Sequence, residues 1–238
     1  MNPVRTNCPP AQQNGNPSNE LMRQKIASFV SSLSPPKVLY IHGQSGVGKT
    51  HLINLTLSNL EDGKKAIKVL NANSFVPSIL SAINKKSLES YRSSLKCYRL
   101  VVIESIDFFS FKQPAHVELL KAVEYVLSHD HMKVIVTSQS HPSKLVGLNR
   151  KRINWLNSCI ILQIACPTNY DKLLLIQAFV RKHRMQISAK AVEYLCVHGP
   201  ENYFYLLGIL NTLNLYYEHT NCPITIRTPE FLILLWRC

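Results

Sequence analysis

Residues 38–52 read VLYIHGQSGVGKTHL. Their first four residues form a nearly all-apolar run, which is typical of a parallel strand buried on both faces. The run leads into a complete G-x-x-x-x-G-K-T motif at residues 43–50, and a helical pattern follows at residues 51–60. The order of strand, glycine-rich loop and helix predicts an α/β fold in which the loop ends at the amino end of a helix.

The residue types in this loop suit the binding of phosphate. Glycines let the backbone wrap so closely that its N–H groups and the positive end of the helix dipole surround phosphate oxygens. Lys49 supplies a point charge for the β and γ phosphates, and the Thr50 hydroxyl is placed to ligate magnesium. The motif therefore predicts a nucleoside triphosphate site. The expected binding residues are Gly43, Gln44, Ser45, Gly46, Val47, Gly48, Lys49, Thr50 and His51.

Strands alternate with helices through the first two thirds of the chain. Further apolar runs occur at residues 66–70, 100–103, 134–136 and 159–162, with helical patterns between most of them. This alternation predicts right-handed βαβ units and a parallel five-stranded sheet between two layers of helices. After Pro167 only helical patterns remain. We expect a disordered arm at 1–17, a three-layer α/β domain at 18–166 and a small all-helical subdomain at 167–238.

The composition narrows the function classes. The chain has 238 residues and a formal net charge of +13, from 27 Lys and Arg against 14 Asp and Glu. Such an excess favours nucleic acid as a partner, then anionic membranes, and a merely basic protein is the alternative. We expect no membrane span, because no apolar run approaches the required length of about 18 residues. The absence of a signal peptide and of C-x-x-C spacing favours a reducing, cytoplasmic location without a zinc site.

Hydrolysis of a bound nucleotide would need an acidic residue at the end of a neighbouring strand. Residues 100–107 read LVVIESID, so Glu104 is the candidate magnesium ligand together with Thr50. Ser105 cannot act as a carboxylate base. Asp107 lies beyond the strand end, where it either substitutes in part or is a solvated turn residue. These residues therefore predict that the chain binds nucleotide but has, at most, a weak ATPase activity.

With these features the chain resembles the AAA+ nucleotide-binding domain of the DnaA family, the bacterial replication initiators and their short homologue Hda. The resemblance implies an AAA+ domain followed by a helical lid, which binds ATP or ADP with Mg²⁺. It also implies a role in the initiation or regulation of chromosomal DNA replication. The resembling segments are residues 18–21, 38–52, 69–75, 136–142, 202–213 and 224–226.

The chain also departs from the family pattern. Glu104 and Ser105 stand where DnaA has two adjacent aspartates, and Gln139 stands where it has another. Phe204 occupies the place of the sensor 2 arginine, and phenylalanine cannot couple the lid to a γ phosphate. The chain leaves no room for a C-terminal helix-turn-helix domain, so we expect a short form that does not recognise an origin by sequence.

Partners also follow from the resemblance. DnaA or a second copy of this chain would pair through AAA+ surfaces, with Arg150 or Arg152 as the arginine finger in trans. A solvated basic loop is the alternative for these two residues. Residues 12–14 do not form the glutamine- and leucine-rich peptide that would bind a sliding clamp, so clamp contact is unsupported.

Single-stranded DNA is the expected nucleic acid, bound through its backbone in a salt-dependent manner. The candidate contacts are Lys85, Lys86, Arg92 and Lys96. Ordinary solvated helix faces are the alternative for these cations. Two further functions stay open: an interaction module that holds nucleotide without turnover, and an ATPase of the helicase-loader type.

Overall fold

The computed structural model describes residues 17–32, 34–58, 67–109, 113–145 and 158–228. Its strands form one sheet in the order β2-β3-β4-β1-β5, and every pairing is parallel. β1 pairs with β4 on one side and with β5 on the other, so the glycine-rich loop leaves from the interior of the sheet. The strands are β1 (Val38–His42), β2 (Ile67–Leu70), β3 (Leu100–Ile103), β4 (Lys133–Ser138) and β5 (Ile160–Gln163).

Helices connect the strands of the sheet, and three further helices follow β5 in the described residues. Those around the sheet are α1 (Pro17–Ser31), α2 (Lys49–Ser58), α3 (Ala72–Asn84), α4 (Leu88–Ser94) and α5 (Gln113–Leu127). Short 3₁₀ turns are η2 (Leu95–Cys97), η3 (Ile106–Phe109) and η4 (Pro142–Lys144). The last helices are α6 (Asn169–His183), α7 (Ala189–His198) and α8 (Tyr203–Thr220). None of the described helices is long and apolar enough to cross a membrane.

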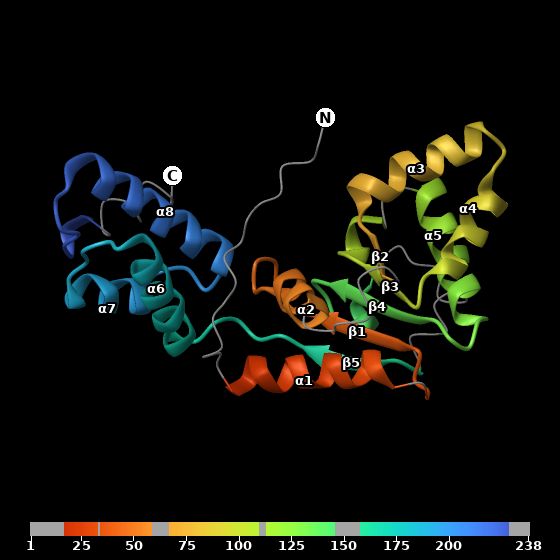
Figure 1. Ribbon diagram of the computed structural model, residues 1–238, viewed down its shortest axis with the longest axis horizontal. Helices are drawn as coiled ribbons and strands as arrows, with labels where there is room; N and C mark the ends of the chain where they lie inside the picture. Colours follow the sequence, from red (N-terminus) through yellow and green to blue (C-terminus); the bar gives the residue numbers. More distant parts are fainter. Residues whose placement is uncertain (1–16, 33, 59–66, 110–112, 146–157, 229–238) are drawn as a thin grey trace. The chain divides into compact units, whose positions relative to one another are not determined.

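Both faces of the sheet are covered. Tyr40 of β1 and Val136 of β4 belong to one buried cluster with Phe75 of α3 and Val123 of α5. Leu39, which points to the opposite face, is fully buried as well. Figure 1 shows α1 and α2 on the side of the sheet away from α3, α4 and α5. The arrangement is the expected three-layer one, in which the carboxyl ends of the strands share one edge.

The fifth strand is less buried than its apolar sequence predicts. Ile160 and Ile161 are 38% and 41% exposed. β5 ends the strand order of the sheet, and β1 is its neighbour there. An apolar run looks the same in an interior strand and in an edge strand, so the pattern alone could not reveal this difference.

The described residues form two compact units, residues 21–165 and residues 166–228, the second of which also includes residues 17–20. The three helices α6, α7 and α8 have a buried core of their own, which includes Ile176, Leu195 and Leu210. An isolated parallel bridge between Ile187 and Ile224 joins the segments before α7 and after α8. The second unit therefore has a hydrophobic core of its own.

Candidate phosphate-binding site

The glycine-rich motif forms a tight loop between β1 and α2. Gly46 and Gly48 have φ angles of 76° and 96°, a region in which other residues are strained. Gly43 is required for space instead, because a Cβ atom there would lie 2.4 Å from the carbonyl oxygen of Ile164. Leu52 N donates to the carbonyl of Gly48 at 2.9 Å and so continues the first turn of α2. The loop therefore ends at the positive end of a helix.

Lys49 is buried inside this loop. Its side chain is anchored by two hydrogen bonds, from Nζ to the carbonyl oxygens of Gly43 at 2.6 Å and Gln44 at 2.8 Å. Burial lowers the pKa of Lys49, and the negative charge of Asp107 acts in the opposite direction. An ammonium group has three N–H donors, so these two bonds leave one for a phosphate oxygen.

The other predicted binding residues are spread around the same loop. Gln44 and Ser45 are exposed at its outer turn, whereas Val47 is buried beneath it. Thr50 is exposed in the first turn of α2. The adjacent His51 is half-buried, and burial lowers the pKa of its imidazole. The loop thus holds a buried lysine and an exposed threonine at the amino end of one helix.

The end of β3 lies at the same edge of the sheet as the loop. Glu104 is half-buried, and its backbone N–H donates to the carbonyl of Leu70 at 2.9 Å. Ser105 has a φ angle of 53°, and its N–H donates to the Thr137 hydroxyl at 2.7 Å. No group of three or more His, Cys, Asp or Glu residues gathers in the described chain. The Thr50 hydroxyl and the Glu104 carboxylate are a donor set that fits magnesium. This ion usually takes one or two protein ligands and completes its shell with waters and substrate phosphates.

Asp107 is held in place, unlike the solvated turn residue that was one alternative. Its Oδ1 accepts a hydrogen bond from Ser138 Oγ at 2.7 Å, and its Oδ2 accepts one from Gln139 N at 2.8 Å. Both partners lie at the end of β4, 31 and 32 residues further along the chain. No pattern in the sequence around Asp107 could have indicated such distant partners.

His42, the last residue of β1, is a further member of the site that the sequence analysis missed. Its buried ring lies edge-on to the ring of His141, with 5.3 Å between centroids. The pKa of His42 is lowered by burial first and then by the charges of His141 and Lys49. Its position directly before the first loop glycine was the one signal that could have found it.

Of the cations predicted to meet DNA, Arg92 is engaged elsewhere. Its guanidinium donates to the Glu118 carboxylate, which also accepts from Lys121 at 2.8 Å. The Arg92 side chain is only 24% exposed. The structure therefore does not support Arg92 as a phosphate contact, since its charge is compensated and partly buried.

The remaining predicted cations differ in accessibility. Lys85 and Lys86 are exposed in the turn between α3 and α4. Lys96 is exposed as well, with its Nζ 5.8 Å from the centroid of the Tyr125 ring. The two arginine-finger candidates, Arg150 and Arg152, lie outside the described residues.

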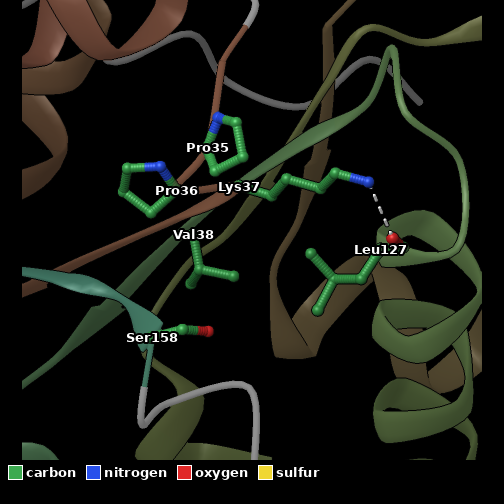
Figure 2. A pocket seen from close by; sticks show the side chains of 6 residues that line it. All are labelled: Pro35, Pro36, Lys37, Val38, Leu127 and Ser158. Carbon is green, nitrogen blue, oxygen red and sulfur yellow. Dashed lines mark hydrogen bonds between the residues drawn. The ribbon is translucent and has the colours of Figure 1, made fainter.

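A separate hollow lies at the opposite end of β1. Its volume is about 490 Å³, and Figure 2 shows Lys37 reaching from it to the carbonyl of Leu127, with an Nζ to oxygen distance of 3.2 Å. The hollow touches Val38, the first residue of β1, whereas the glycine-rich loop follows the last residue. Its lining is mostly apolar and has no glycine-rich backbone, and the Nζ of its one lysine, Lys37, is paired with Asp130 at 2.8 Å. The hollow therefore does not have the features of a phosphate site.

Comparison with known sequences adds to this geometry. The family model of the bacterial DnaA ATPase domain matches residues 14–163. The chromosomal replication initiator proteins DnaA of Helicobacter hepaticus and Nitrosomonas eutropha are 25% and 26% identical to this chain over 182 and 193 residues. These alignments cover 75% and 79% of this chain but only 39% and 41% of the two relatives. The chain thus spans about two fifths of their length.

Solved structures share the fold. Domain III of the Thermotoga maritima replication initiation protein DnaA superimposes with a TM-score of 0.79 over 92% of both chains, at 16% identity. AMPPCP-bound DnaA from Aquifex aeolicus gives a TM-score of 0.72 at 18% identity, over 84% of this chain and 63% of that chain. A DnaA bound to AMPPCP and single-stranded DNA also gives 0.72 at 18% identity, over 89% and 66%. The expected three-layer AAA+ α/β fold is confirmed.

Proposed function

Because the chain belongs to the bacterial DnaA ATPase-domain family, we propose that it binds ATP or ADP in the initiation or regulation of chromosomal DNA replication, in the cytoplasm. One observation carries the proposal: Lys49 is buried and anchored to the carbonyls of Gly43 and Gln44, in a loop with two glycines at positive φ. Two solved proteins of this fold are bound to AMPPCP, an analogue of ATP.

Each group of the loop has a task in this proposal. Backbone N–H groups and the dipole of α2 hold the phosphate oxygens, and Lys49 donates its third N–H to them. Thr50 and Glu104 would hold Mg²⁺, whose charge neutralises the β and γ phosphates when the ion is bound. The residues present suit this ion because they offer one hydroxyl and one carboxylate at the same edge of the sheet.

Hydrolysis in this proposal is weak or depends on a partner. Ser105 brings no carboxylate to the place where a second acid would orient water, and its backbone is tied to Thr137. Phe204 brings no charge from α8. Arg152 remains the candidate for an arginine supplied in trans. The same observations favour the second candidate function, a nucleotide-bound interaction module without turnover.

The proposed partners are DnaA or a second copy of this chain, paired through AAA+ surfaces. Single-stranded DNA is the proposed nucleic acid, because a DnaA with this fold is bound to it. In this chain the exposed Lys85, Lys86 and Lys96 would contact its phosphates.

The direct test is a titration of purified protein with fluorescent ATP and ADP analogues. We expect Lys49→Ala to weaken the binding of both nucleotides by about tenfold to a hundredfold, since a hydrogen bond to a charged group contributes about 1.5–3 kcal/mol. Lys190→Ala, which removes an exposed lysine of α7, should bind like the wild type. A wild-type chain that binds neither nucleotide at millimolar concentration would rule out the proposal.

A second measurement separates the two candidate functions. Phosphate release from ATP is followed with the chain alone, with DnaA, and with DnaA and single-stranded DNA. Slow release that increases with DnaA and disappears in Lys49→Ala supports an ATPase. Binding without release in every mixture supports the interaction module.

A further inference from the structure

The residue that leads into the phosphate-binding loop is a buried histidine. His42 ends β1 and directly precedes Gly43, and it is only 9% exposed. Its carbonyl accepts a hydrogen bond from Ile164 N at 2.8 Å, so its backbone is fixed beside the end of β5. Histidine is the side chain whose ordinary pKa lies nearest to neutral pH. A proton on this ring would place a second positive charge beside the loop, in addition to that of Lys49.

The ring of His42 contacts the ring of His141, which follows the end of β4. The two rings lie edge to face at 90°, with 5.3 Å between their centroids. His141 Nδ1 accepts a hydrogen bond from Ser143 N at 3.3 Å and lies 2.8 Å from Ser143 Oγ. A ring nitrogen that accepts a hydrogen bond carries no proton, so the His141 ring is neutral in this arrangement. Because two adjacent imidazolium rings would repel each other, a proton on the pair is best placed on His42.

The groups around His42 keep its ring neutral in the free protein. Burial lowers the pKa of His42 most, and the charges of His141 and Lys49 lower it further. Asp107 acts on Lys49 and on Tyr40. The Tyr40 ring lies 6.4 Å from that of His42 between centroids, but burial raises the pKa of its phenol, so it stays uncharged near neutral pH. The strand partners of His42 on β4 and β5 are a serine and a glutamine, which do not titrate.

A bound nucleotide reverses the electrostatic effect on this ring. In the proposed site the phosphates lie against Lys49, and their negative charge offsets the charge that disfavours a proton on His42. A nearby negative charge stabilises an imidazolium, so the pKa of His42 rises when the nucleotide binds. The complex then holds more protons than the free protein wherever the pH lies between the two pKa values. Affinity for the nucleotide therefore increases as the pH falls.

We propose that His42 is a proton-linked member of the phosphate site, which becomes an imidazolium when a nucleotide binds and contributes a second positive charge beside Lys49. The proposal rests on the nucleotide binding proposed above. The proton comes from the solvent, and no bond to the nucleotide forms. His141 sets the pH range of the effect, because its ring lies against that of His42 and disfavours a charge there.

Three variants separate this role from a structural one. His42→Gln keeps a polar side chain that carries no charge at any pH. His141→Asn removes the neighbouring ring but keeps an oxygen that can accept from Ser143 N. His131→Gln is the matched control, because His131 is exposed and precedes β4, at the opposite edge of the sheet. The nucleotide itself and the other titratable groups of the loop, such as His51, are common to all four proteins.

The measurement is the dissociation constant of ADP with Mg²⁺ from pH 6 to pH 8, by competition with a fluorescent nucleotide. The ratio of the constants of His42→Gln and the wild type removes the titration of ADP. We expect this ratio to be about three- to tenfold larger at pH 6 than at pH 8, since a shift of one pKa unit corresponds to a tenfold change in affinity. His141→Asn should keep the pH dependence and shift it to higher pH. His131→Gln should match the wild type throughout.

Calorimetry in two buffers of different ionisation enthalpy measures the proton uptake directly. At about pH 6.5, the wild type should take up more protons per bound ADP than His42→Gln. A histidine with a purely structural role would make a different prediction. Its loss would weaken binding by the same factor at every pH and would leave the proton count unchanged.

Two results would overturn the inference while leaving the proposed function intact. One is a His42→Gln variant with the pH dependence and proton count of the wild type. The other is a loss of the pH dependence in His141→Asn alone, which would assign the proton to the other ring. A wild-type chain that binds no ADP at any pH is a different failure, since it removes the proposed function as well.

Melting temperatures of all four proteins at each pH show whether a change in binding comes from misfolding. If His42→Gln does not fold, the comparison of His141→Asn with the wild type decides. A pH dependence that moves to higher pH supports the inference, and one that does not move contradicts it.

Discussion

At the scale of single residues, the loop glycines are not interchangeable. Gly46 and Gly48 satisfy a backbone requirement, whereas Gly43 satisfies a requirement for space. The atom that excludes a side chain at Gly43 is the carbonyl oxygen of Ile164, whose own N–H donates to the His42 carbonyl at 2.8 Å. That carbonyl belongs to backbone already tied to β1, so it cannot move away easily.

Gly43→Ala is therefore expected to reduce the free energy of unfolding by about 1–3 kcal/mol, the usual effect of forcing extra atoms into a packed site. Urea unfolding of the two proteins measures the difference. Gly208→Ala serves as the control, because alanine is favoured over glycine inside a helix such as α8. Equal stabilities of Gly43→Ala and the wild type would show that the Ile164 backbone shifts to make room for the added Cβ atom.

The residues of the candidate phosphate loop could be identified from the sequence because they are contiguous and each has a constrained chemistry. Asp107 and Arg92 could not, since their roles depend on partners 26 to 32 residues away. Sequence spacing alone left Asp107 between two alternatives and placed Arg92 among the DNA contacts. Only the pairing of β3 with β4 and the packing of α4 beside α5 bring these partners together.

At the scale of elements, strands and long helices are the predictable part of this fold. Apolar runs between turn residues indicated all five strands, and the helical pattern at residues 51–60 indicated α2, which spans Lys49–Ser58. β5 is more exposed than its apolar run predicts, because an edge strand and an interior strand share the same apolar pattern. The short α4 has no buried residue, so hydrophobic periodicity could not indicate this helix.

One buried carboxylate connects α4 with α5 and makes stability depend on pH. Burial raises the pKa of Glu118, but hydrogen bonds and charges from Lys121 and Arg92 outweigh it and hold the pKa below the ordinary 4.5. A group with a lowered pKa in the folded state stabilises the fold above its unfolded pKa. That contribution is lost as the pH falls from 4.5 through the folded pKa.

Glu118→Gln should consequently lower the free energy of unfolding by about 1–3 kcal/mol at pH 7, because the amide accepts weakly from Arg92 and Lys121. The difference from the wild type should shrink below pH 4.5. Urea unfolding at several pH values tests this. Glu124→Gln, an exposed position on the same helix, is the control. A difference that is the same at pH 7 and pH 3.5 would contradict the role of the charge.

At the scale of the whole molecule, the excess of positive charge does not by itself identify a DNA surface. The net charge is +13, and the Lys and Arg residues that produce it lie in both compact units. Some of these cations are compensated, such as Arg92 by Glu118, and some are buried, such as Lys133 and Lys172. A DNA contact must therefore be distinguished from the general attraction of any polyanion.

The salt dependence of binding to a single-stranded oligonucleotide makes this distinction. Each phosphate contact contributes about 0.7 to the slope of log K against log salt, so Lys85→Ala/Lys86→Ala should reduce the slope by about 1.4 if both lysines touch the backbone. Lys182→Ala/Lys190→Ala removes the same charge from exposed positions on α6 and α7. Equal reductions in the two double variants would mean that net charge alone attracts the strand. A reduction confined to Lys85 and Lys86 would place the strand at the turn between α3 and α4, because only ions in contact with a phosphate release its counterions.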